Sequence, residues 1–167
     1  MDKKLILVAG LPGTGKTTLA RALARALGFE HFNSDKIRDE LGLRGQYDAA
    51  SKSSVYEAML SRARVALKSG KGVVVDASFY KKAYREPFEC LARETGVSVL
   101  WIELKAAEPV IQKRVGKRRP FTEADFEVYQ KLKSEFEPFD KPVLVLSGDE
   151  MSPDEMVEKV RLLLAPV

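Results

Sequence analysis

The 167-residue sequence contains a single cysteine, Cys90, so the chain cannot form an internal disulfide. No apolar stretch approaches the ~20 residues that span a bilayer, and the run Leu5–Ala9 is too short for the core of a signal peptide. These absences favour a cytoplasmic location. Cys90 falls within a helical pattern beside Leu91 and Ala92, which predicts a small packed side chain.

Histidine is as scarce as cysteine, and charge of one sign is not in large excess. His31 is the single histidine, and no second His or Cys near it completes a metal site, so we expect a structural role for it. The 28 basic and 24 acidic residues leave a net charge of +4. That charge is compatible with an anionic partner but does not by itself indicate nucleic acid.

The most specific feature that is present is a phosphate-binding loop. Gly10–Thr17 reads GLPGTGKT and matches G-x-x-x-x-G-K-[ST], between an apolar run typical of a buried strand and a helical pattern. The loop amides and the N-terminus of the following helix can bind phosphate oxygens. Lys16 can bind the outer phosphates, and the Thr17 hydroxyl can bind a Mg²⁺ ion. The predicted nucleotide-binding residues are Gly10, Leu11, Pro12, Gly13, Thr14, Gly15, Lys16, Thr17 and Thr18.

Strand and helix patterns alternate along the rest of the chain. The predicted strands are 5–9, 29–33, 73–76, 97–104 and 143–146. The predicted helices are 19–27, 35–43 (capped by Ser34 or Asp35), 49–68, 82–95, 109–115, 122–136 and a last helix capped by Ser152. This alternation predicts one α/β domain over 1–167, with three α/β/α layers, a parallel five-stranded sheet and ligands at the carboxyl ends of its strands.

Two charged residues follow the second predicted strand at helical spacing. Asp35 and Arg38 are three positions apart at a helix start, so both side chains face the same way. The carboxylate could accept the proton of an attacking hydroxyl, and the guanidinium could hold a phosphate. The alternative is a capping Asp beside a surface Arg.

A further acid closes the third predicted strand. Asp76 follows the apolar run 73–75 at the strand end, where ligands of parallel sheets bind. It could order Mg²⁺ and its waters, or it could fix Arg38. The alternative is a turn or helix cap.

Basic residues cluster at the end of one predicted helix and in the loop after it: Lys113, Arg114, Lys117, Arg118 and Arg119. Phosphoryl transfer needs positive charge over the transferred group, and a lid of about residues 114–126 could supply it. Arg114 and Arg118 are the candidates, whereas Lys117 and Arg119 are interpreted as solvated. Cations near a helix C-terminus are the alternative explanation.

Aromatic residues fall in or near the segments expected on the acceptor side. These are Tyr47, Tyr56, Phe79 and Tyr80, and any of them could line an acceptor pocket. Periodicity does not choose among them.

Four segments in this order resemble the P-loop kinases that phosphorylate a hydroxyl: Gly10–Thr17, Asn33–Arg38, Asp76 and Lys113–Arg118. The sequence is most similar to the 5′-hydroxyl polynucleotide kinase domain of phage and its small predicted-kinase relatives. The resemblance implies a sheet of strand order 2-3-1-4-5. It implies these roles: Lys16 and Thr17 on nucleotide and Mg²⁺, Asp35 as general base, Arg38 on phosphate, Asp76 as the third-strand acid, and Arg118 as the lid arginine.

The resemblance also has a limit on the acceptor side. Segment 41–54 carries only Arg44 and Lys52 as positive residues, without the basic and aromatic track expected for a single strand of nucleic acid. Gluconate kinases, antibiotic phosphotransferases and zeta-type toxins are similar in fold and motifs, and fold does not name an acceptor.

We therefore expect an ATP- and Mg²⁺-dependent kinase with a hydroxyl acceptor, Lys16, Asp35, Arg38 and Arg118 being its catalytic residues and Thr17 and Asp76 its metal site. A nucleic-acid 5′-hydroxyl is the first expectation. The alternatives are a small-molecule kinase acting on a sugar, nucleoside or antibiotic, and a non-catalytic nucleotide-binding switch. The sequence does not choose between ATP and GTP.

Overall fold

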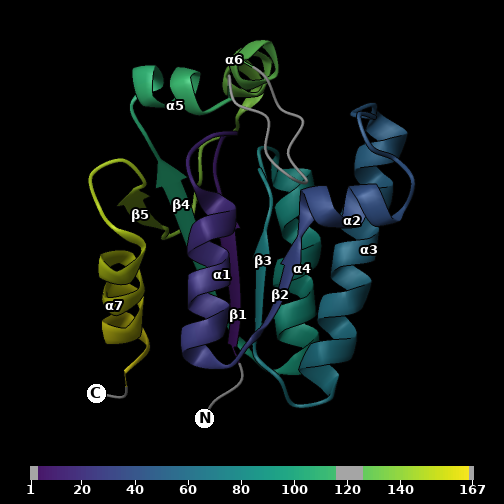
Figure 1. Ribbon diagram of the computed structural model, residues 1–167. Coiled ribbons are helices and arrows are strands. Elements are labelled where there is room, and N and C mark those ends of the chain that lie inside the picture. The colour runs from purple at the N-terminus through teal and green to yellow at the C-terminus, as the bar shows by residue number, and fades with distance from the viewer. Residues whose placement is uncertain (1–3, 116–125, 166–167) are drawn as a thin grey trace.

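The computed structural model describes residues 4–115 and 126–165 and has a central sheet between helical layers (Figure 1). The strands are β1 (Lys4–Ala9), β2 (Glu30–Asn33), β3 (Val73–Asp76), β4 (Ser98–Lys105) and β5 (Leu144–Ser147). Every pair is parallel, in the order β2-β3-β1-β4-β5. The expected α/β class and strand order are thus confirmed.

The helices cover both faces of the sheet. They are α1 (Lys16–Leu27), α2 (Ser34–Glu40), α3 (Ala49–Lys68), α4 (Lys82–Thr95), α5 (Glu108–Val115), α6 (Phe126–Glu135) and α7 (Pro153–Leu164). Helices α1 and α7 pack on one face, and α2, α3 and α4 pack on the other. Helices α5 and α6 lie beyond one end of the sheet, at the top of Figure 1.

The central strand β1 shows how the two cores arise from one sequence run. Its five residues after Lys4 are completely buried. Leu5 and Leu7 pack toward α3 and α4, whereas Ile6 and Val8 pack toward α1 and α7. Because successive side chains of a strand point to opposite faces, a continuous apolar run is what a two-sided sheet requires.

Helix α2 differs from its prediction at both ends. Its N-cap is Asn33, whose side chain accepts a hydrogen bond from the Lys36 amide at 2.8 Å, so neither Ser34 nor Asp35 is the cap. The helix ends at Glu40 rather than at residue 43, because Gly42 follows with φ +73°. The last helix does begin with the predicted Ser152 capping box, whose partner is Glu155.

Two other features bear on the sequence-based expectations. Cys90 is exposed on α4 and not packed, which corrects the interpretation drawn from its apolar neighbours; Arg93 Nη2 lies 3.2 Å from its sulfur. In the described residues no helix is both long and apolar enough to cross a membrane. The start of the helix predicted at 122 lies outside those residues.

Candidate active site

A cleft of about 610 Å³ lies at the carboxyl ends of β1, β2 and β3. Its donor half is bordered by the phosphate-binding loop and by Asp76, and its acceptor half by α2 and α3. Residues of α5 and α6 line it as well. The cleft therefore brings together all the described segments to which the sequence assigned chemistry.

The phosphate-binding loop is closed by its own side chains. Thr14 Oγ1 and Lys16 Nζ donate to the Leu11 carbonyl at 2.8 and 3.0 Å. Gly15, at φ +98°, ends the loop in a left-handed conformation, and α1 begins at the next residue. Burial lowers the pKa of Lys16, and the carboxylates of Asp76 and Asp35 oppose that shift. The α1 amides and Lys16 thus share one point for anion binding.

A second loop and a helix hold the phosphate-binding loop from behind. A Cβ on Gly148 would lie 2.0 Å from the Thr14 carbonyl oxygen, so the loop after β5 packs directly on it. The Arg114 guanidinium of α5 donates to the carbonyls of Gly13 and Gly148 at 3.1 and 3.0 Å. Arg114 thus lines the cleft while bound to both loops, and Arg118 lies outside the described residues.

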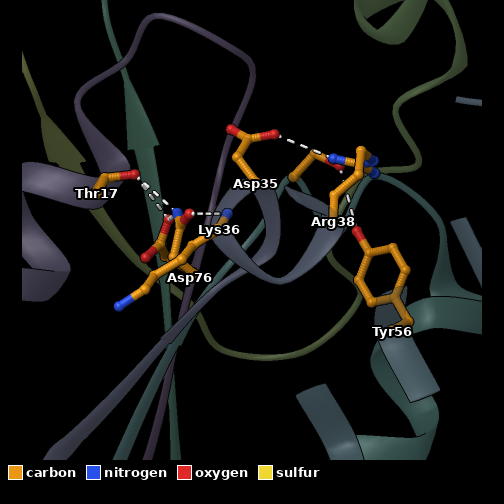
Figure 2. Close-up of polar contacts among 8 residues, drawn as sticks. Thr17, Asp35, Lys36, Arg38, Tyr56 and Asp76 are labelled. Atoms are coloured by element: carbon orange, nitrogen blue, oxygen red, sulfur yellow. Dashed lines mark hydrogen bonds and ion pairs between the residues drawn. The ribbon is translucent and has the colours of Figure 1, made fainter. Parts of the chain in front are cut away.

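Asp76 is the centre of a hydrogen-bonded cluster beneath the loop (Figure 2). Its side chain is 1% exposed and accepts from Thr17 Oγ1 at 3.1 Å and from Asn33 Nδ2 at 2.8 Å. Asn33 Nδ2 also contacts Thr17 Oγ1 at 3.0 Å. His31 Nε2 lies 2.5 Å from the other carboxylate oxygen. Asp76 therefore binds these three side chains, and in the described residues Arg38 pairs with Asp35 rather than with Asp76.

His31 and Asn33 are cleft residues that the sequence did not identify as such. Both come from β2, whose Asn33 pairs in register with Asp76 of β3. The expectation that His31 is merely structural misses its place beside Asp76. A signal existed, because the predicted strand order makes β2 and β3 neighbours, but it identifies the pair only once the register is known.

The Thr17 hydroxyl and the Asp76 carboxylate form a donor set that fits Mg²⁺. This ion takes oxygen ligands and is usually bound by one or two protein groups together with phosphates and waters. In the residues that the structure describes, no group of three His, Cys, Asp or Glu side chains forms a metal cage. These two oxygen ligands therefore suit a Mg²⁺ ion whose remaining ligands are nucleotide phosphates and waters.

Asp35 and Arg38 stand on the other side of the cleft, in the first two turns of α2. Arg38 Nη1 donates to Asp35 Oδ1 at 3.0 Å, as their spacing predicts. The Arg38 side chain is 9% exposed, and its guanidinium carbon lies 4.5 Å from the centre of the Tyr47 ring. Its Nε is buried without a hydrogen-bond partner among the described residues. A buried donor left unpaired is costly, which favours a ligand group here.

The floor of the acceptor half is held in a strained backbone conformation. Phe79 has φ +48°, which is uncommon for a bulky residue. Its amide donates to the Tyr56 hydroxyl at 3.0 Å, and its carbonyl accepts from Arg85 Nε at 2.6 Å. Burial raises the pKa of Tyr56 to about 12, so the hydroxyl keeps its proton and can share it with Ser78 Oγ, 3.3 Å away.

The aromatic candidates divide between cleft and core. Tyr47, Tyr56 and Tyr80 line the cleft, whereas the Phe79 ring is completely buried against Phe88 and Trp101. Sequence periodicity could not separate Phe79 from Tyr80, because the positive φ of Phe79 sets which of these two adjacent side chains faces the cleft.

Several known proteins are similar to this chain in sequence. Residues 5–139 match the family model described as an AAA domain. An uncharacterized protein of Mycobacterium tuberculosis is 32% identical over 67% of this chain, and the chain spans a quarter of its length. The shikimate kinase of Hahella chejuensis is 26% identical over 95% of this chain and 84% of its own, and the gluconokinase of Gluconobacter oxydans 26% over 96% and 90%.

Solved structures show the same fold. A putative kinase from Chloroflexus aurantiacus has a TM-score of 0.77 at 23% identity, covering 97% of this chain and 98% of that one. The Mycobacterium tuberculosis APS kinase CysC, solved with AMPPNP and APS, has a TM-score of 0.74 at 20% identity, covering 98% of both chains. Since the family model covers most of the chain and its phosphate-binding loop, the chain belongs to the AAA domain family.

Proposed function

We propose that this chain is an ATP-dependent kinase that transfers the γ-phosphate to a hydroxyl group of a small molecule. The observation that carries the proposal is the position of Asp35 in the same cleft as the phosphate-binding loop. A nucleotide-binding switch needs the loop alone, whereas a carboxylate across the cleft provides the base that an acceptor hydroxyl requires.

The donor half would bind the triphosphate through the amides of 10–18 and the Lys16 ammonium. Thr17 and Asp76 would hold Mg²⁺, which neutralises charge on the phosphate oxygens when it is bound. Asn33 donates to both of these residues and fixes their oxygens in place. Arg114, together with the predicted lid residue Arg118, would add positive charge near the transferred group.

The acceptor half would place the hydroxyl near Asp35. Arg38 donates to Asp35 Oδ1 and orients the carboxylate, which would accept the proton of the attacking hydroxyl. The hydroxyl oxygen forms the new bond to phosphorus as the bond to the ADP oxygen breaks. The tyrosines that line this half would exclude water and limit wasteful hydrolysis.

A small acceptor is better supported than the nucleic-acid 5′-hydroxyl expected from the resemblance. A shikimate kinase and a gluconokinase are among the similar proteins, and each aligns over nearly the whole of this chain. The cleft volume of about 610 Å³ lies in the ordinary range for small ligands and has to include the nucleotide phosphates.

A transfer screen tests the proposal. The purified chain is incubated with γ-labelled ATP or GTP, Mg²⁺ and separate acceptors: shikimate, gluconate, neutral sugars, nucleosides, and 5′-hydroxyl DNA and RNA. We expect label on a small molecule. Label on DNA or RNA alone would support a nucleic-acid 5′-hydroxyl kinase instead. Specific nucleotide binding without transfer to any acceptor would support a non-catalytic nucleotide-binding switch.

A further inference from the structure

Lys52 is a positive residue in the acceptor half to which the proposed reaction gives no role. It lies in the first turns of α3, is half-buried and lines the cleft. Its Nζ donates to the Tyr80 hydroxyl at 2.8 Å and lies 4.9 Å from the centre of that ring. Across residues 4–115 and 126–165 it forms no ion pair and no other hydrogen bond.

Lys52 adds a positive charge near the N-terminus of α3, where Asp48 at the cap is the one acidic residue in the described first turn and cap. A helix N-terminus carries partial positive charge and is stabilised by acidic residues, but the first turn of α3 contains none. The ammonium therefore adds to the positive end of a 20-residue helix. The α3 cap, Asp48, directs its carboxylate to Ser51, with Oδ1 2.6 Å from Ser51 Oγ, and forms no ion pair with Lys52.

A second, independent feature borders the same corner of the cleft. Arg38 is stacked on Tyr47, which directly precedes the α3 cap, and its buried Nε has no partner in the described part of the chain. The Asp35 carboxylate pairs with Arg38, whereas Lys52 has no carboxylate partner in the described residues. Two tyrosine rings complete the corner, so the charges stand in a partly apolar surrounding, where an ionic contact is stronger than in water.

We propose that Lys52, with Tyr80 beside it, forms a subsite for an anionic substituent of the acceptor, and that this kinase selects hydroxy compounds carrying a carboxylate or a phosphate. The inference rests on the proposed function only in calling the bound compound a phosphate acceptor. Binding of an anion at Lys52 can be measured without phosphoryl transfer. Lys52 would hold the anion while Asp35 receives the hydroxyl proton, so the two ends of one molecule are fixed. Lys52 acts on affinity and selectivity and takes no part in bond making.

The test compares charged and neutral compounds on the same scaffold. The chain is saturated with AMPPNP and Mg²⁺ so that the phosphate-binding loop is occupied. Binding of three pairs is then measured by calorimetry: shikimate and its methyl ester, gluconate and glucitol, glycerol 3-phosphate and glycerol. The first two pairs report on a carboxylate and the third on a phosphate.

We expect the anionic member of at least one pair to bind about tenfold or more tightly than its neutral partner, since a charge-assisted hydrogen bond is gained. Lys52→Met should abolish the preference, and Lys52→Arg should retain much of it. The control is Lys68→Met, which removes an exposed lysine from the last turn of the same helix. AMPPNP affinity should be equal in all four proteins.

Two results would overturn the subsite: no pair shows a preference in the wild-type chain, or the preference survives in Lys52→Met. The transfer screen tests the kinase activity, and its outcome is independent of the binding measurements that test the subsite. Anion binding that depends on Lys52 without phosphoryl transfer would refute the kinase and keep the subsite. Transfer to an anionic acceptor with the same KM in the wild-type chain and in Lys52→Met would support the kinase and refute the subsite.

Discussion

The donor and acceptor halves of the cleft differ in how their polar atoms are satisfied. On the donor side, Asp76 binds three side chains, and Lys16 binds the loop carbonyl of Leu11. On the acceptor side, Arg38 Nε is buried without a partner in the described residues, and Lys52 has only a tyrosine hydroxyl. Nucleotide phosphates are the same in every donor, so backbone and local contacts can form their site before they bind. A site that selects among acceptors depends instead on polar side chains whose hydrogen bonds are completed by the ligand.

The largest expected effect belongs to the acceptor half. Asp35→Asn removes the proposed base and should lower kcat by roughly 10²- to 10⁴-fold, the usual contribution of general acid–base catalysis. ATP affinity, measured by calorimetry, should be nearly unchanged. Asp39→Asn on the same helix is the matched control. Near wild-type turnover of Asp35→Asn would refute the assignment of the base.

A smaller effect is expected in the donor half, where two variants of Asn33 separate metal binding from folding. Asn33→Ala and Asn33→Ser both lose the amide donor to Thr17 and Asp76, and each should raise the Mg²⁺ concentration for half-maximal activity by about 10- to 100-fold. Only Ala also loses the α2 cap, which should cost about 1 kcal/mol of unfolding free energy. Equal Mg²⁺ dependence in wild type and Asn33→Ser would count against the proposed ion site.

The packing behind the phosphate-binding loop gives a third expectation. Gly148→Ala would force a methyl group against the Thr14 carbonyl and should weaken ATP binding by roughly tenfold, within the range of overpacking costs. In Gly72→Ala the added Cβ would meet the Phe29 ring, away from the cleft. That control should lower thermal stability without changing ATP affinity. If both variants bind ATP equally well, the loop contact is unimportant for the site.

The smallest expected effect lies in the acceptor floor. Tyr56→Phe leaves the buried Phe79 amide unpaired and should lower the free energy of unfolding by about 1–3 kcal/mol, measured with urea. Because Phe79 has a positive φ, we also expect a higher KM for the acceptor. Tyr129→Phe makes the same change at a buried tyrosine for which the structure shows no hydroxyl hydrogen bond in the described residues. An identical KM in the two variants would show that the strained turn does not shape the acceptor site.

How well each part of the site could be predicted depends on the sequence separation between the residues that contact one another. The phosphate-binding loop and the Asp35–Arg38 pair depend on neighbours within a few positions, so their spacing in the sequence was sufficient. The contacts of Asp76 with His31 and Asn33 join residues 45 and 43 positions apart and need the register of β2 on β3. Arg114 reaches Gly13 across 101 positions, which a helical pattern cannot reveal.

Side-chain environment was the other property that pattern alone could not decide. Cys90 has apolar neighbours in sequence and is exposed, because α4 turns its other face to the core. The sequence placed Lys52 and Tyr80 on the acceptor side without linking them, and their contact arises only because α3 packs beside the turn after β3.

By itself the sequence determined the α/β alternation, the strand order implied by the resemblance, and the phosphate-binding loop, because periodicity and backbone geometry are local. Only the tertiary structure decided which polar atoms meet in the cleft. Those contacts depend on strand register, on the strained turn at Phe79 and on the packing of α3. Each of these brings together residues that are far apart in the chain. Within the described residues, only the tertiary structure shows that Arg38 Nε has no hydrogen-bond partner and that Lys52 has no ion pair. These two observations carry the inference about the acceptor's charge.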